Sequence, residues 1–179
     1  MNARTHAIGD PLAQPRPAAA PAAFGPIAIA RGLGQGPTPL AAFDAAPLDA
    51  GVANYNLIVL SSVIPPGSVI ERRRWHTPPQ DWGRRLYCVL SQHREDRPGH
   101  SAHAGIGWVH DAASGAGLFV ELHGDDRDRL GADLHATLQA MQAQRGIDLG
   151  PVHTEIASTR CVSDPVCALV IAVYAAAPW

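Results

Sequence analysis

The chain has 179 residues, enough for one domain with a hydrophobic core, and its formal net charge of -2 gives no electrostatic reason to expect nucleic acid or an anionic membrane as a partner. All 14 basic residues are arginines. The lack of lysine excludes a pyridoxal-phosphate (PLP) Schiff base, a Walker A phosphate site and a lysine nucleophile. An enzyme of this sequence that acts on amines must therefore find its electrophile elsewhere, for example in a carbonyl made from the backbone.

Residues 1–25 are rich in alanine and proline without periodicity, and they predict a disordered tail ahead of a single folded domain over residues 26–179. No apolar run approaches the ~20 residues that a membrane span needs. The N-terminus also lacks the basic start and continuous apolar core of a signal peptide. We therefore expect a cytoplasmic protein with no membrane partner.

The folded part begins with an alternating segment, residues 26–31, that predicts a strand. The glycines at positions 32, 34 and 36 predict a turn after it, and their spacing does not fit the G-x-G-x-x-G dinucleotide fingerprint. Thr38 and Pro39 then suit the N-cap and first position of a helix that ends by Gly51. Pro47 should kink this helix or end its regular part. We expect three of its apolar residues to face inward: Leu40, Phe43 and Leu48.

The most informative stretch follows this helix. Asn56 to Leu60 is a short apolar run with β-branched residues, which predicts a buried strand, and it stops at Ser61 and Ser62 just before a Pro-Pro-Gly breaker. Each of the two hydroxyls needs a hydrogen-bond partner if it is buried. From composition alone, a turn in which the serines satisfy their own hydroxyls remains an alternative to a functional site.

The remaining segments predict a mixed domain. Residues 71–83 form a polar segment whose arginine triplet, residues 72–74, suits a solvated or subunit-facing edge. Residues 85–92 predict a strand, and residues 102–111 and 117–123 predict a hairpin. A helix that begins at Asp125 or Asp126 and ends at Gly146 should bury one face, made of Leu130, Leu134, Leu138 and Met141. Residues 152–162 and 166–175 predict a closing pair of strands, so the fold class is α+β with mainly antiparallel sheets.

The cysteines and histidines give no strong signal for a metal. Cys88, Cys161 and Cys167 form neither a disulfide framework nor a CxxC zinc site, and we expect reduced buried thiols, although Cys161 and Cys167 could face each other across a hairpin. His100 and His103 lie in a loop with no helix to set their spacing and no identifiable third ligand. We therefore expect no metal.

Residues 32–67 resemble the pyruvoyl-dependent arginine decarboxylases. The shared pattern is a Gly-rich turn, a helix with Phe-Asp, an Ala-Gly, an Asn-Leu strand, Ser-Ser and Pro-Pro-Gly, in this order and at matching spacing. A weaker resemblance continues through residues 105–124 and reaches the C-terminus. The resemblance implies a four-layer αββα sandwich, a homo-oligomer that is a trimer or dimer of trimers, and a small amino-acid substrate.

The resemblance also implies a covalent pyruvoyl cofactor made from Ser62. The Ser62 hydroxyl would attack the carbonyl carbon of Ser61, in a step that needs a strained peptide, and elimination would cut the chain into a β chain, residues 1–61, and an α chain, residues 62–179. Asn56 matches the asparagine that promotes this cleavage, although capping the start of a strand is an alternative role for its amide. The new ketone would accept the electrons released with CO₂ from an α-amino acid, as PLP does elsewhere.

Three further residues match family positions that act on the substrate. Glu121, in an apolar strand, matches the proton donor, and burial should raise the pKa of such a carboxyl, although an outward-facing position is an alternative for it. Asp44 matches the position that contacts the arginine side chain, for which a bidentate carboxylate is suited, although a solvent-facing place on the helix is an alternative for it. Leu40 matches a neighbouring substrate contact. The sequence thus predicts decarboxylation of L-arginine to agmatine. The same chemistry on another amino acid, and an uncleaved trimeric relative that only binds a ligand, remain alternatives.

Overall fold

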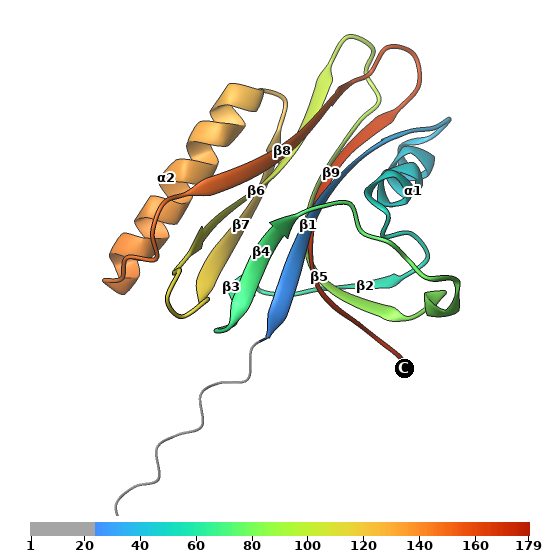
Figure 1. The fold of residues 1–179 in the computed structure, drawn as a ribbon. Coiled ribbons are helices and arrows are strands. Elements are labelled where there is room, and N and C mark those ends of the chain that lie inside the picture. The colour runs from blue at the N-terminus through green and yellow to red at the C-terminus, as the bar shows by residue number, and fades with distance from the viewer. Residues whose placement is uncertain (1–23) are drawn as a thin grey trace, which may run out of the picture.

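The computed structural model describes residues 24–179, which form two β-sheets and two helices of more than one turn (Figure 1). The first sheet has the strand order β2-β5-β9-β1-β4, and the second has the order β3-β7-β6-β8. The predicted tail falls on residues outside the described part except for its last two, since β1 already begins at Gly25. The strands are β1 (Gly25–Gln35), β2 (Asn56–Val59), β3 (Val63–Ile64), β4 (Ser68–Arg72), β5 (Arg85–Glu95), β6 (Ser101–His110), β7 (Gly117–Gly124), β8 (His153–Arg160) and β9 (Val166–Ala177).

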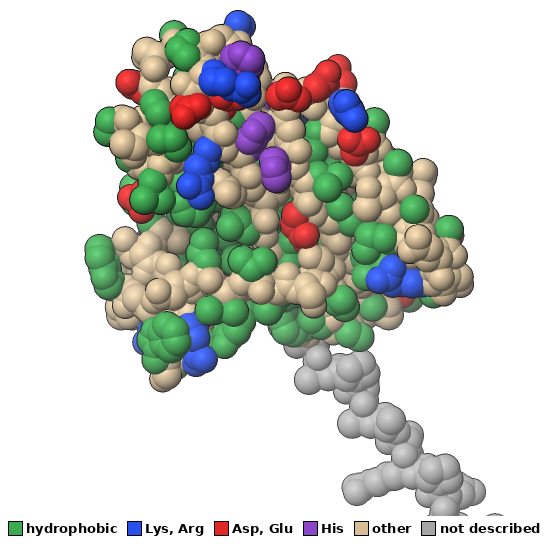
Figure 2. Space-filling view, turned by 180° about the vertical axis from the view of Figure 1, so that it is seen from behind, with side chains coloured by type: hydrophobic (Ala, Val, Ile, Leu, Met, Phe, Trp, Pro, Cys, Tyr) green, Lys and Arg blue, Asp and Glu red, His purple; other side chains and the backbone are tan. Residues whose placement is uncertain are grey.

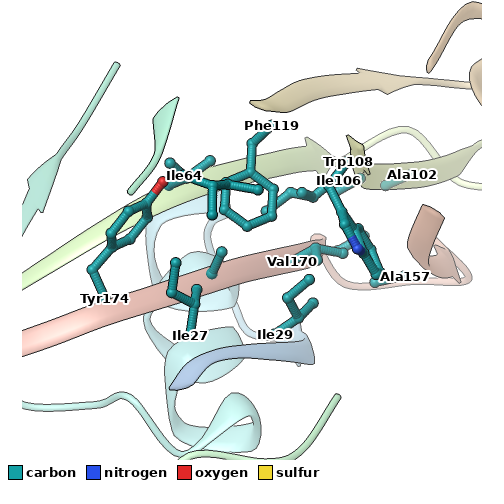
Figure 3. Packing of buried hydrophobic residues seen from close by; sticks show 14 of the residues in the cluster. Ile27, Ile29, Ile64, Ala102, Ile106, Trp108, Phe119, Ala157, Val170 and Tyr174 are labelled. Carbon is teal, nitrogen blue, oxygen red and sulfur yellow. The ribbon is translucent and has the colours of Figure 1, made fainter. Parts of the chain in front are cut away.

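Each sheet buries one face against the other sheet and one against a helix. Helix α1 (Pro39–Ala50) packs on the first sheet and α2 (Arg127–Arg145) on the second (Figure 1). Between the sheets lies a third apolar cluster that includes Ile29, Ile106, Phe119 and Val170 (Figure 3). The predicted α+β class, with mainly antiparallel sheets, is confirmed; the parallel pairs are β1 with β4 and β2 with β5.

The glycine-rich segment does not form the predicted turn but continues strand β1 to Gln35. A Cβ atom on Gly32 would lie 2.0 Å from the carbonyl oxygen of Ala46, and one on Gly34 would lie 2.0 Å from that of Ala42. Both oxygens belong to α1, so the missing side chains are what allow this helix to lie directly on the strand. The glycines serve close approach, and not a turn.

Helix α1 has the predicted ends but a different buried face. The Thr38 hydroxyl accepts a hydrogen bond from Ala41 N, and Gly51 closes the helix with φ of 83°. The expected inward positions are wrong for Leu40 and Leu48, which are 66% and 54% exposed. The helix instead packs through small residues, because the glycines of β1 leave no space for leucine, and the helix continues through Pro47. Its buried residues are Ala42, Ala46, Pro47 and Ala50.

Helix α2 follows its sequence prediction closely. Asp126 caps it by accepting hydrogen bonds from Asp128 N and Arg129 N, and Gly146 ends it with φ of 62°. Leu130, Leu134 and Leu138 are buried against the second sheet, and Met141 packs at the edge of the same cluster. The i, i+4 leucine spacing therefore identified the buried face correctly.

The pairing of the strands differs from the prediction at three places. Strands β8 and β9 do not pair with each other, because β8 lies beside β6 in the second sheet and β9 lies between β5 and β1 in the first. Strand β2 is an edge strand with Val59 62% exposed, so it is not buried as expected. The start of the expected polar segment, residues 71 and 72, belongs to strand β4, which pairs with β1.

Candidate active site

The serine pair lies where the chain crosses from one sheet to the other. Strand β2, at the edge of the first sheet, ends at Val59, and β3, at the edge of the second, begins at Val63. Leu60 is hydrogen-bonded to the first sheet, because its N–H donates to Cys88 O at 2.8 Å. Ser62 is hydrogen-bonded to the second sheet, because its carbonyl oxygen accepts from Phe119 N at 2.8 Å. The peptide bond between Ser61 and Ser62 is thus held between two anchored segments.

Ser62 has a left-handed backbone conformation, with φ of 63°. Glycine adopts this conformation easily, whereas a serine residue there costs about 1–2 kcal/mol. Such strain is stored only where the surrounding structure holds the residue in place, and here the hydrogen bonds on both sides do so. The predicted scissile position is therefore a strained one.

The Ser62 hydroxyl donates a short hydrogen bond to the carboxylate of Glu121, which is 59 positions away in the sequence. Glu121 lies on β7 opposite Ile106, on the face that points toward the first sheet. Burial raises the pKa of the Glu121 carboxyl above its ordinary value, and the hydrogen bond from Ser62 offsets only part of this effect. The structure therefore brings together three predicted site residues: Ser61, Ser62 and Glu121.

The sequence analysis missed Tyr174, whose hydroxyl donates to Val63 O at 2.9 Å, one residue beyond Ser62. Burial raises the pKa of this tyrosine, so its hydroxyl stays protonated and remains a donor. A hollow of about 390 Å³ lies beside Ser61 and is lined mostly by apolar side chains, including Phe24, Leu60 and Tyr87. A lone tyrosine in an apolar strand gave no local signal of this contact, because the partner is 111 residues away.

Asn56 does not lie at the serine pair of its own chain. Its side-chain amide donates to Gly83 O at 2.6 Å, at the start of strand β2, which is the alternative capping role. Ser61 lies five positions further along the extended chain, or about 16 Å away at the usual rise of a strand. A role of Asn56 in cleavage stays a prediction. At this distance Asn56 does not contact the serine pair of its own chain.

Asp44 and Leu40 also lie away from Ser62. They are four residues apart on the exposed face of α1, which covers the outer face of the first sheet. The neighbouring Phe43 ring stacks under the Arg94 guanidinium at 4.7 Å. Arg94 is six residues along β5 from Cys88, the partner of Leu60, so Asp44 is roughly 20 Å from the serine pair. One chain does not bring these substrate-binding candidates to the serines.

The described residues hold no group of three or more histidine, cysteine or acidic side chains that could bind a metal ion. The three cysteines are free and buried, and Cys161 and Cys167 lie in different core clusters, so they do not face each other across a hairpin. None of the helices in residues 24–179 combines the length and the apolar character needed to cross a membrane.

Comparison with known proteins gives consistent results. Residues 26–177 match the family model for pyruvoyl-dependent arginine decarboxylase. The chain is 41% identical over 96 residues to a pyruvoyl-dependent arginine decarboxylase of Halobacterium salinarum, covering 53% of this chain and 58% of that one. It is 31% identical over 125 residues to one from Methanothermobacter thermautotrophicus, covering 69% and 79%. The match thus spans less than two thirds of the Halobacterium protein.

A solved structure of a pyruvoyl-dependent histidine decarboxylase aligns with a TM-score of 0.42 and 18% identity, over 59% of this chain and 56% of that one.

Proposed function

The chain belongs to the pyruvoyl-dependent arginine decarboxylase family, and we propose that it is a self-processing enzyme that converts L-arginine to agmatine and CO₂. The observation that carries this proposal is the contact between the Ser62 hydroxyl and the Glu121 carboxylate at a strained backbone position. This contact supports the proposal, because the residue that would rearrange and the acid that would give up a proton lie side by side. The lack of lysine fits a carbonyl cofactor made from the chain itself.

Maturation would use the strain at Ser62. Its oxygen attacks the carbonyl carbon of Ser61, the amide bond between them becomes an ester, and elimination then releases the β chain, residues 1–61. Hydrolysis of the resulting dehydroalanine expels ammonia and leaves a pyruvoyl group at residue 62. Replacing an amide by an ester is unfavourable in a relaxed chain, and relief of the left-handed conformation offsets part of that cost. When present, the pyruvoyl carbonyl supplies the electron sink for decarboxylation.

Glu121 would supply the proton that replaces the carboxylate at the substrate Cα. A proton donor works best when its pKa is close to the working pH, and burial shifts the pKa of Glu121 in that direction. Its carboxyl already contacts residue 62, because it accepts the hydrogen bond of the Ser62 hydroxyl.

Substrate recognition would require a second chain. We propose a homotrimer of four-layer αββα subunits in which α1 of one subunit, with Asp44 and Leu40, covers the hollow beside Ser61 of the next. Exposed apolar side chains at both places support this arrangement: Leu40 and Leu48 on α1, and Phe24, Val59 and Val63 around the serines. Contact between two different patches is heterologous, and it closes into a ring such as a trimer when the rotation between neighbouring subunits allows it. An effect of Asn56 on cleavage would then act on a neighbouring chain.

The buried free cysteines suit a reducing compartment, so the proposed location is the cytoplasm.

The test is the mass of the denatured purified protein. We expect two fragments that meet at the 61/62 bond, with the C-terminal fragment lighter than its unmodified sequence by the exchange of an amine for a ketone. Ser62→Ala should give one uncut chain without activity, whereas Ser114→Ala, a matched change in an exposed turn, should leave cleavage unaffected. Cleavage in Ser62→Ala would refute the mechanism. A wild-type chain that stays whole would favour the ligand-binding relative.

Two measurements separate the remaining alternatives. Glu121→Gln should still be cut, because the amide oxygen can accept the Ser62 hydrogen bond, but it should decarboxylate at least about 100-fold more slowly without an acid. Turnover of a panel of amino acids identifies the substrate, and a marked preference for one without a guanidinium would replace arginine in the proposal.

A further inference from the structure

Strand β7 presents a second ionisable residue next to Glu121 on the same face. Side chains alternate along a strand, so Phe119, Glu121 and His123 point toward the first sheet, whereas Leu118 and Val120 pack against α2. Successive residues on one face are about 7 Å apart. A single bridging water spans about 5.6 Å between two polar atoms, a distance that flexible side chains at such positions can reach.

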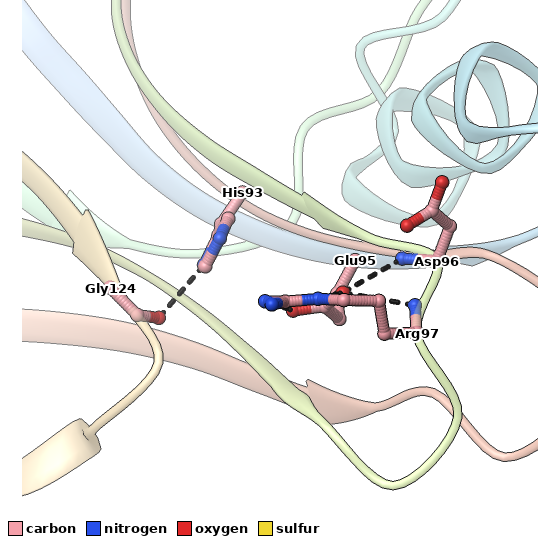
Figure 4. Close-up of polar contacts among 5 residues, drawn as sticks. All are labelled: His93, Glu95, Asp96, Arg97 and Gly124. Carbon is pink, nitrogen blue, oxygen red and sulfur yellow. Dashed lines mark hydrogen bonds and ion pairs between the residues drawn. The ribbon is translucent and has the colours of Figure 1, made fainter.

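His123 in turn contacts a second histidine. Its ring centroid is 5.3 Å from that of His93 on β5, with an angle of 48° between the ring planes. The Nδ1 atom of His93 lies 2.8 Å from Gly124 O (Figure 4). A carbonyl oxygen only accepts, so Nδ1 of His93 carries a proton and its Nε2 is left to exchange one.

The two histidines and Glu121 differ in their exposure to solvent. Glu121 is partly buried, whereas His123 is exposed and His93 is half-buried. Figure 2 shows adjacent histidine side chains in the middle of the face opposite that of Figure 1, with an acidic side chain on the same face. Of these three residues, His123 thus has the most direct contact with bulk water.

Amino-acid decarboxylation consumes a proton in each turnover. The bond from Cα to the carboxylate carbon breaks, CO₂ leaves, and the electron pair that remains forms a C–H bond with a proton from Glu121. Glu121 is then a carboxylate, and it cannot act again until a proton reaches it from solvent. Burial of the acid makes it a better donor but also slows its direct exchange with water.

Resting on the function proposed above, we propose that His123, backed by His93, is the relay that returns this proton to Glu121. The imidazolium of His123 gives its proton to the Glu121 carboxylate through one water, and His93 or solvent replaces it. The relay acts through Glu121 and needs no contact with the substrate, so neither histidine is a catalytic residue in the strict sense.

The charged surroundings include both signs. Carboxylates and guanidiniums both lie near the pair, together with a third histidine. Burial lowers the pKa of that third histidine, His103, which keeps it neutral beside the pair. The ionisable groups near the histidines are His103 from β6, Glu121 from β7, and Asp125, Asp126, Arg127, Arg129 and Asp133 from the loop and helix α2. Glu95, which is paired with Arg97, lies two positions beyond His93 on β5.

The test compares His123→Gln with the matched exposed change His135→Gln on α2, with cleavage of each verified by mass. We expect kcat of His123→Gln to fall about 10-fold at pH 8 with KM unchanged, to recover toward pH 5.5, and to rise with the concentration of imidazole buffer. His135→Gln should follow wild type. His93→Gln, which breaks the pair from the other side, should show the same buffer dependence and replaces His123→Gln if the latter is not cut.

A purely structural role would lower kcat equally at every pH and buffer concentration, which would overturn the relay, as would an unchanged pH profile. A wild-type protein that is uncut or inactive would instead overturn the proposed function. The two failures are therefore distinguishable.

Discussion

The left-handed conformation of Ser62 can be tested on chains that do not cleave. Ser62→Ala and Ser62→Gly both remove the nucleophile and the hydrogen bond to Glu121, so each should remain a single chain of the same length. Alanine keeps the cost of φ at 63°, about 1–2 kcal/mol, whereas glycine does not. Glycine also loses about 0.5–1 kcal/mol more backbone entropy on folding. The net expectation is that Ser62→Gly is the more stable variant by about 0.5–1 kcal/mol.

The measurement is urea unfolding of both variants at one protein concentration, with equal m values required for the comparison. Ser101 on β6 provides the control, because its φ is not positive and the ordinary order should hold there, with Ser101→Gly less stable than Ser101→Ala. If Ser62→Gly were equally or less stable than Ser62→Ala, the fold would not impose the left-handed conformation. The proposed source of strain for cleavage would then be absent.

Two further predictions concern the rest of the fold. Gly34→Ala places a Cβ atom 2.0 Å from Ala42 O and should lower the free energy of unfolding in urea by about 3 kcal/mol. The control Gly131→Ala, in an open position of α2, should raise it by about 0.5–1 kcal/mol. Equal effects of the two changes would contradict the contact of α1 with β1. Glu95 accepts four hydrogen bonds from Asp96 and Arg97, chiefly from the Arg97 guanidinium, which lowers its pKa to about 2 (Figure 4). A carboxyl whose pKa is lower in the folded state stabilises the fold at pH values above its ordinary pKa of 4.5, so the stability should fall as the pH drops from 4.5 to about 2. Glu95→Gln should remove this pH dependence in acid titrations followed by circular dichroism.

Local patterns predicted the elements of the fold, but not how they meet. The caps at Thr38 and Asp126 and the leucine face of α2 depend on residues within a few turns, and the structure confirms them. The glycines of β1 indicated a turn because glycine adopts turn conformations easily, which is a property of the residue itself. Their lack of a side chain matters only because α1 lies on the strand. That contact involves residues more than seven positions away and leaves no periodic signal.

The same distinction applies to the site. The serine pair and its breaker are contiguous, so the sequence alone identified them, and the resemblance supplied Glu121, which the structure brings to Ser62 from 59 residues away. The Tyr174 contact with Val63 and the pair of His93 and His123 arise from four different strands. Alternation along β7 was the one local signal that could have linked His123 to Glu121. Asp44 lies outside the reach of Ser62 because α1 and the serines lie on opposite sides of the first sheet.

The position of the serine pair also explains how the chain could be cut without losing its fold. Residues 1–61 would contribute β1, α1 and β2, and each is held by residues after position 61. Strand β1 pairs with β4 and β9, β2 pairs with β5, and α1 packs on β9. The peptide bond between Ser61 and Ser62 belongs to none of these pairs, because it lies in the link between two edge strands of different sheets. Cleavage there would remove one strained connection and leave the strand pairings in place, so relief of strain is not offset by loss of packing.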